Sequence, residues 1–234
     1  MKHQEERFAG DGTVTLIEQQ IKNKERYNMH LNGEYAFSIH EDVLIKHRIS
    51  KGVFLSTAAI DAILADEEGH KAQQHALRWI GSRGYSQAEM KLRLKKQGYA
   101  QEAIDYAIAF LLQYNYLNDE QFAGQLAEQR IYSQKKGRNW VKQELLHKGI
   151  AKDKVDAAFE GIDPEREYAA ALSAAEKKWR TLRDEPLTCQ RKTAAFLLRR
   201  GYGNEIVRRI IKKLAEDEGT RTDFTDDFID HEYN

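Results

Sequence analysis

The residues of this chain best suited to chemistry are cations that gather near its C-terminal end. Arg208, Arg209, Lys212 and Lys213 lie close together in the sequence. On a helix that turns by about 100° per residue they share one face, and apolar residues such as Ile210 share the opposite one. Like charges four residues apart destabilise a helix by about 0.2–0.5 kcal/mol, and no acid interrupts this face. The pattern therefore favours a surface that binds phosphates or carboxylates over an ordinary solvated face.

Smaller clusters of cations occur earlier in the chain. Lys135, Lys136 and Arg138 form a loop directly before a predicted helix. Such a loop suits phosphate binding, because the free N–H groups and the dipole of a helix N-terminus add to the side-chain charges. The sequence agrees equally well with a loop that is ordinary solvent-exposed surface and binds no ligand. The full set of candidate contacts with DNA or an acidic partner comprises Arg83, Lys91, Lys95, Lys96, Arg130, Lys135, Lys136, Arg138, Lys142, Lys148, Arg191, Lys192, Arg199, Arg200, Arg208, Arg209, Lys212 and Lys213.

The sequence contains none of the common catalytic motifs. It has no phosphate-binding loop, no dinucleotide glycine fingerprint and no two-histidine metal helix. The 8 histidines are scattered, and the single cysteine, Cys189, lacks the partners that a zinc site requires. No apolar run approaches the roughly 18 residues of a membrane helix, and the first residues lack the apolar core of a signal peptide. We therefore expect a cytoplasmic protein that is not an enzyme and has no cofactor, metal or membrane contact.

The formal net charge of zero conceals a strong segregation. Residues 1–70 carry a net charge of −4, residues 71–216 carry +10, and residues 217–234 carry −6. Within the basic part, residues 168–214 alone carry +8. A basic body with an acidic tail is typical of a protein with a polyanionic or acidic partner.

One pattern of two helices around a glycine occurs three times. The glycines are Gly98, Gly149 and Gly201, which are 51 and 52 residues apart. Mostly apolar residues recur at fixed distances before and after them, namely Met90, Leu94, Ile104 and Ile108, then Val141, Leu145, Val155 and Phe159, then Thr193, Leu197, Val207 and Ile211. Such a repeat predicts an array of small helical modules and not one catalytic pocket.

The N-terminal part predicts a small β-meander over residues 12–55. Asn32-Gly33 separates two runs of alternating apolar residues, which is the strongest short signal of a hairpin with a type I′ turn. Residues 42–47 are predicted as either a further strand or a single helical turn. A sheet this small needs a cover for its apolar face, and we expect the next helix to provide it.

Helical periodicity begins at Thr57, with a possible break at Gly69. Ser86 and Glu89 form a capping box that starts a later helix, and Asp163-Pro164 starts another. Because each module has few apolar residues, we expect neighbouring modules to share some core.

Aromatic residues are frequent, and stacking on nucleobases is one conceivable use for them. Trp79, Trp140 and Tyr106 nevertheless have the spacing of core residues. We therefore expect these three to be packed inside the protein.

The predicted fold is mainly α, a tandem array of three three-helix, helix-turn-helix-like repeats after a small N-terminal β segment. The predicted divisions are residues 1–56, 57–117, 118–162, 163–215 and an acidic tail, 216–234. The tail has no sustained periodicity. It is interpreted either as a solvated, flexible end or as a pseudo-ligand that competes for the basic surface.

Three sequence blocks resemble the bacterial RecX regulatory family in their order and spacing. They are RGYSQAEMKLRLKKQGY at 83–99, YLNDEQFA at 116–123 and KKGRNWVKQELLHKGI at 135–150. The third repeat matches through RRGYGNEIVRRII at 199–211, with a looser link through Pro186. The β segment resembles the extension found on longer members from Gram-positive bacteria.

The resemblance implies a cytoplasmic modulator of the RecA recombinase, active in DNA repair and homologous recombination. Such proteins bind the filament of RecA on single-stranded DNA and typically limit its assembly, its ATPase and its SOS coprotease activity. The implied partners are the RecA filament and single-stranded DNA, with duplex DNA bound weakly. We expect a monomer.

A second hypothesis belongs to another functional class. Short helix pairs closed by glycine resemble helix-turn-helix units. The chain could then be a sequence-tolerant nucleic-acid-binding protein that acts without RecA. Tight, steeply salt-dependent binding to DNA alone would favour this hypothesis.

Overall fold

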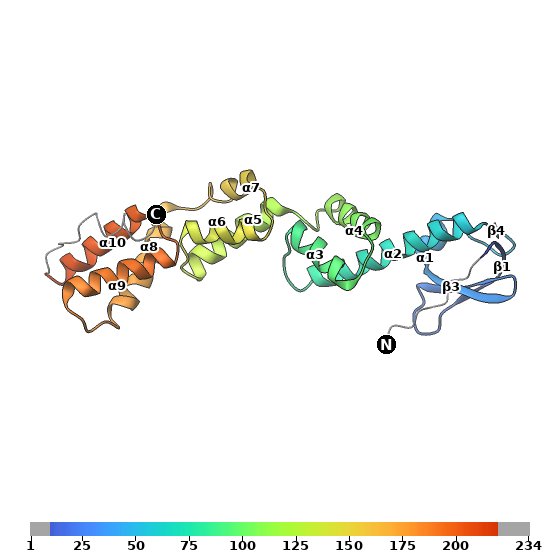
Figure 1. The fold of residues 1–234 in the computed structure, drawn as a ribbon, viewed down its shortest axis with the longest axis horizontal. Helices are drawn as coiled ribbons and strands as arrows, with labels where there is room; N and C mark the ends of the chain where they lie inside the picture. Colours follow the sequence, from blue (N-terminus) through green and yellow to red (C-terminus); the bar gives the residue numbers. More distant parts are fainter. Residues whose placement is uncertain (1–9, 220–234) are drawn as a thin grey trace. The chain divides into compact units, whose positions relative to one another are not determined.

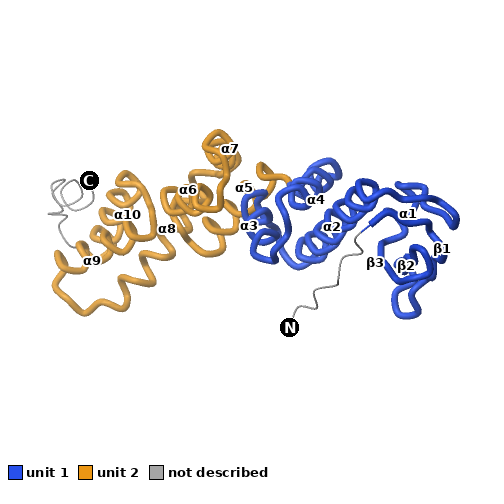
Figure 2. Tube along the Cα trace, turned by 45° about the vertical axis from the view of Figure 1, so that its right-hand side comes forward, with its two compact units in different colours: residues 1–117 blue, residues 118–234 orange. Residues whose placement is uncertain are grey.

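The computed structural model describes residues 10–219 of the chain. The chain divides into two compact units, residues 1–117 and 118–234, which are coloured separately in Figure 2. The first unit holds a small sheet and one helical module, and the second unit holds two further helical modules (Figure 1). This confirms the mainly α fold with three helical repeats after an N-terminal meander.

The sheet has four antiparallel strands in the order β3-β2-β1-β4. They span Gly12–Gln19 (β1), Arg26–Leu31 (β2), Glu34–His40 (β3) and Phe54–Leu55 (β4). Asn32 and Gly33 join β2 to β3 with φ angles of 51° and 91°, which are the positive values that a type I′ turn requires. The hairpin is therefore confirmed. For residues 42–47 the sequence predicts either a strand or a helical turn, and the structure shows a helix, Glu41–Lys46 (α1).

A long helix, Thr57–Ile80 (α2), covers the sheet as predicted. Met29, Leu31 and Ile39 point from the sheet into a cluster of buried apolar residues that also contains Ile60 and Ile63 of α2. The sheet thus gains the apolar contacts that it lacks by itself.

The predicted break at Gly69 is wrong, because α2 is continuous through this residue. A Cβ atom on Gly69 would lie 2.9 Å from the ring of Tyr106 on helix Gln101–Gln113 (α4). The glycine therefore serves helix packing and does not interrupt the helix. The expectation of a buried Tyr106 is also wrong, because the side chain rests on Gly69 but remains 39% exposed.

The first helical module consists of the second half of α2, helix Gln87–Gln97 (α3) and α4. Ser86 and Glu89 form the predicted capping box. Gly98 ends α3 with a φ of 91°, the left-handed conformation that favours glycine. Trp79 packs partly buried against the core of this module.

The second unit repeats the three-helix arrangement twice. The second module contains Asp119–Glu128 (α5), a π-helical turn at Gln129–Ser133, Arg138–His147 (α6) and Lys152–Ala157 (α7). The third contains Pro164–Trp179 (α8), Pro186–Arg199 (α9) and Asn204–Asp217 (α10). Asp163 caps α8 as predicted, and Pro186 occupies the first turn of α9.

The residues at the repeated positions form the cores of the three modules. All twelve positions noted around the three glycines are buried, and Gly149 and Gly201 adopt φ angles of 76° and 86°. The second and third modules, however, have separate clusters of buried apolar residues. The expectation of a shared core is therefore wrong for this pair, which is joined by polar and backbone contacts instead.

Helix α10 continues two residues into the predicted acidic tail, and Glu218 accepts a hydrogen bond from the Trp179 indole at 2.6 Å. The rest of that prediction, residues 220–234, lies outside the described residues. None of the helices between residues 10 and 219 has the length and apolar character to cross a membrane.

Candidate partner-binding surface

The cationic face predicted near the C-terminal end is present on α10. Arg208, Arg209, Lys212 and Lys213 are all exposed, whereas Ile210 and its apolar neighbours are buried in the core of the third module. Burial of the apolar side fixes the rotation of the helix. The four cations must therefore face outward.

The acids that pair with Arg209 and Lys212 are themselves exposed. Arg209 Nη1 lies 3.3 Å from Glu165 Oε1, and its guanidinium group stacks on the Tyr168 ring at 3.9 Å from the centroid. Lys212 Nζ lies 4.0 Å from Glu216 Oε1. Exposed ion pairs contribute no more than about 1 kcal/mol. The anionic groups of a partner can therefore replace these acids at small cost.

Helix α9 adds further exposed cations to the third module. Arg191, Lys192 and Arg199 are all exposed. Lys192 Nζ pairs with Asp184 Oδ2 at 2.7 Å. Arg199 has no acidic partner within the described part of the chain.

The basic loop before α6 has a different environment, because it packs against the third module. Gly137 N donates to the carbonyl of Arg200 at 2.8 Å, and Asn139 N donates to that of Gly201 at 3.0 Å. The Arg200 side chain donates in return to two carbonyls of the loop, including that of Lys135 at 2.7 Å. We call this contact between the second and third modules the seam.

Two glycines allow the backbones to meet at the seam. A Cβ atom on Gly137 would lie 2.2 Å from the backbone of Gly201. A Cβ atom on Gly201 would lie 2.3 Å from Trp140 N, and Gly201 also has a positive φ. Any larger residue at either position requires the seam to open.

An ion pair closes the same seam. Arg138 Nε lies 2.5 Å from Glu167 Oε2, and Arg138 Nη2 donates to the carbonyl of Ile162 at 3.1 Å. Glu167 is only 2% exposed. The Tyr202 hydroxyl is also buried, and its pKa is raised by that burial and further by Glu167, against the opposing effect of Arg200. Without Arg138, a carboxylate would remain buried beside an unpaired hydroxyl.

A groove of about 430 Å³ lies beside the seam. It is lined by Lys135, Ala174, Lys177, Lys178, Thr181, Phe196 and Arg200. Its apolar floor and cationic border suit a ligand that is both acidic and partly apolar. Lys177 and Lys178 are missing from the candidates chosen from the sequence, although their position in the strongly basic segment could have indicated them.

Known protein families match the chain in four consecutive segments. The model of the regulatory protein RecX N-terminal domain matches residues 12–56, and those of the first, second and third RecX three-helix domains match residues 72–111, 118–158 and 165–211. A regulatory protein RecX from Clostridium perfringens (strain 13 / Type A) is 31% identical over 210 residues, which cover 88% of this chain and 98% of that protein. The chain belongs to the RecX regulatory protein family.

Other RecX proteins agree with this assignment. One from Clostridium botulinum (strain Eklund 17B / Type B) is 30% identical over 203 residues, covering 86% of this chain and 95% of that protein. A crystal structure of regulatory protein RecX matches with a TM-score of 0.76 and 28% identity, covering 85% of this chain and 98% of that one. The surfaces described above therefore belong to the second and third RecX three-helix domains.

Arg130 and Lys142, two candidate cations of the second RecX domain, form ion pairs within that domain. Arg130 forms a two-pronged ion pair with Glu144, with both N–O distances at 2.7 Å. These hydrogen bonds raise the pKa of Arg130. Lys142 Nζ pairs with Asp156 Oδ1 at 3.0 Å. Arg130, like Arg138, stabilises the protein itself, and the contact surface proposed below leaves both out.

Two lysines of the same domain lie over aromatic rings. Lys136 Nζ is 4.1 Å from the centroid of Trp140, and Lys148 Nζ is 5.9 Å from that of Phe122. Trp140 is only partly buried against its core cluster. The exposed face of the Trp140 ring contacts the Lys136 ammonium group in a cation–π interaction. Trp140 is therefore not the fully buried residue that its spacing predicts.

The first RecX three-helix domain carries its candidates around α3. Lys95 and Lys96 are exposed in the last turn of α3 and have no acidic partner among the described residues, and Lys91 is partly buried. The Arg83 guanidinium lies 3.6 Å from the ring centroid of Tyr85, and its Nη1 is 3.4 Å from Glu89 Oε2. Lys95 and Lys96 therefore combine exposure with the lack of an acidic partner among the described residues.

Proposed function

We propose that this protein is a non-enzymatic regulator of the RecA recombinase that binds the RecA–single-stranded DNA filament and inhibits it. Membership of the RecX family supports the choice of partner. The observation that carries the proposal is the exposed cationic face of α10, which lies opposite a largely buried apolar face. In this mechanism the face meets phosphates of the DNA and acidic residues of RecA together.

Charge alone cannot direct such a protein to one target. Non-specific DNA affinity is typically about 10⁻⁴–10⁻⁶ M at physiological salt. Most cellular nucleic acid would then compete for the protein. Specificity must therefore come from protein contacts, for which the groove beside the seam offers an apolar floor between cations.

The direct test adds the chain to RecA filaments pre-formed on single-stranded DNA. The proposal predicts that DNA-dependent ATP hydrolysis falls and that filaments shorten, both with increasing protein concentration. Unchanged filaments and turnover at saturating protein would overturn the inhibitory role. Faster turnover or longer filaments would keep RecA as the partner but reverse the sign of the regulation.

A second candidate function is sequence-tolerant nucleic-acid binding without RecA. The short helix pairs, closed by glycines in the left-handed conformation, favour this reading. Electrophoretic shift assays with single-stranded and duplex DNA, at several salt concentrations and without RecA, separate the two functions. Our proposal predicts weak binding in these assays, whereas tight binding with a steep salt dependence would support the alternative.

A further inference from the structure

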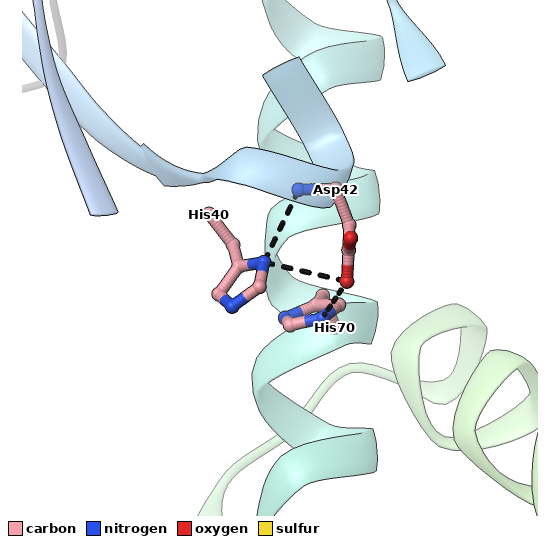
Figure 3. Close-up of side chains that lie close together, drawn as sticks. All are labelled: His40, Asp42 and His70. Carbon is pink, nitrogen blue, oxygen red and sulfur yellow. Dashed lines mark hydrogen bonds and ion pairs between the residues drawn. The ribbon is translucent and has the colours of Figure 1, made fainter. Parts of the chain in front are cut away.

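A separate group of polar residues lies in the first unit, where the sheet meets α2. His40 ends β3 and caps α1, Asp42 lies in the first turn of α1, and His70 lies in the middle of α2. The side chains of His40 and His70 are 12% and 5% exposed, whereas that of Asp42 is 66% exposed. Figure 3 shows the carboxylate of Asp42 beside both imidazole rings. The group is therefore largely buried but open to water on one side.

Both ring nitrogens of His40 lie beside polar atoms. Nδ1 accepts a hydrogen bond from the backbone N–H of Asp42 at 3.2 Å. Nε2 faces Glu25 Oε2 at 3.5 Å. Nδ1 also lies 3.4 Å from Asp42 Oδ2. A ring nitrogen and a carboxylate oxygen, both of which can bind a metal ion, thus lie side by side.

We propose that His40 Nδ1, Asp42 Oδ2 and His70 Nε2 bind a divalent transition-metal ion of the zinc type, with water as a fourth ligand. The three residues each offer a ligand atom within 4.8 Å of the other two. A tetrahedral ion with bonds of about 2.0–2.1 Å places its ligand atoms roughly 3.3 Å apart. The observed separations from Asp42 Oδ2 are 3.4 Å to His40 and 3.2 Å to His70. The rings of His40 and His70 stack with their centroids 4.1 Å apart, so both rings must turn to direct these nitrogens at one ion.

The ligand types select the class of metal. Two imidazoles and one carboxylate suit zinc and its neighbours, whereas calcium and magnesium prefer oxygen ligands throughout. Glu25 supplies the carboxylate that commonly orients a metal-bound histidine through its second ring nitrogen. The backbone N–H of His40 donates to Glu67 Oε2 at 2.8 Å, which holds the corner of the chain in place.

Binding would change two hydrogen bonds and join two elements. His70 must carry its proton on Nδ1 so that Nε2 can bind the ion, and the Asp42 N–H must give up its bond to His40. Lys71 and Arg78 line the adjacent cavity of about 270 Å³, and their positive charges moderate the affinity. The bound ion would tie the β3–α1 corner to α2, and so tie the sheet to the long helix.

The test is a zinc titration of the full, metal-free chain in competition with a chromophoric chelator. We expect one equivalent to bind, and Co²⁺ to give the intense visible absorption of a tetrahedral site. H70Q and D42N should each weaken binding by at least ~10-fold, the lower end of the effect of losing even an outer partner. Asp42 is exposed, so D42N keeps the test valid if H70Q does not fold.

The matched control is D66N, which removes the carboxylate that contacts His47 Nε2 at 2.6 Å in the same unit. The His47–Asp66 pair offers only one imidazole and is not part of the proposed site. The D66N variant should therefore bind zinc with the affinity of the natural chain. Equal affinity of the natural chain and D42N, or a loss in D66N as large as in D42N, would overturn the proposed site. Absence of stoichiometric binding would overturn it as well.

Discussion

The basic loop before α6 and the basic face of α10 are both rich in cations but have different surroundings. Arg138 of the loop is paired with a buried glutamate at the seam, whereas Arg209 of the face is paired with an exposed one. Gly137 of the loop touches the backbone of the third module. Equal charge thus serves internal docking in one region and remains available to a partner in the other. What separates the two roles is the burial of the acid that each cation meets.

The largest expected effect is that of R138M, which leaves the buried carboxylate of Glu167 without its cation. Breaking a buried ion pair costs about 3–5 kcal/mol. We expect the lower end of this range, because the Arg138 side chain is 33% exposed. Urea unfolding followed by circular dichroism measures the loss in free energy of unfolding. R209M, which removes the cation of the exposed Arg209–Glu165 pair, should change the free energy of unfolding by less than ~1 kcal/mol.

A double variant sharpens this contrast. R138M/E167M removes both charges and leaves side chains of similar size, which is often neutral. It should therefore recover most of the stability that R138M loses. An R138M chain as stable as R209M would show that the two basic regions do not differ in the way described.

The next largest loss of stability is expected at Gly137 of the basic loop, compared with Gly203, which precedes α10. Gly137 and Gly203 both cap helices, with φ/ψ of −79°/160° and −71°/155°. A Cβ atom meets the backbone at Gly137 but nothing within 4 Å at Gly203. G137A and G203A share the loss of capping preference, roughly 0.5–1 kcal/mol. G137A should lose about 1–3 kcal/mol more through overpacking, and equal losses in urea unfolding would refute the role of the close contact.

The regular parts of the fold could be predicted from local sequence. Asn32-Gly33 predicts a hairpin, Ser86 and Glu89 predict the start of a helix, and the repeated apolar positions predict three similar cores. Gly69 could not be interpreted in this way, because its role depends on Tyr106, a residue of another helix. Local patterns predict local conformation, whereas packing between helices depends on which residues meet.

The same limit applies to the candidate surface. The face of α10 follows from helical periodicity, so it could be derived from the sequence alone. The structural role of Arg138 could not, because Glu167 lies 29 residues away on another helix. His40 and His70 likewise come from separate elements, and no motif spacing connects them.

The most direct measurement reverses the charge of the α10 face. The variant R208E/R209E/K212E/K213E should retain its helical circular dichroism, because all four side chains are exposed. The matched control, K22E/K24E/R48E/K51E, makes the same charge change at four exposed residues of the sheet module. Both are compared with the natural chain for inhibition of RecA ATP hydrolysis on single-stranded DNA.

The account predicts that the α10 variant loses inhibition and the control retains it. A folded α10 variant that inhibits as strongly as the natural chain would contradict the central claim that this face meets the filament.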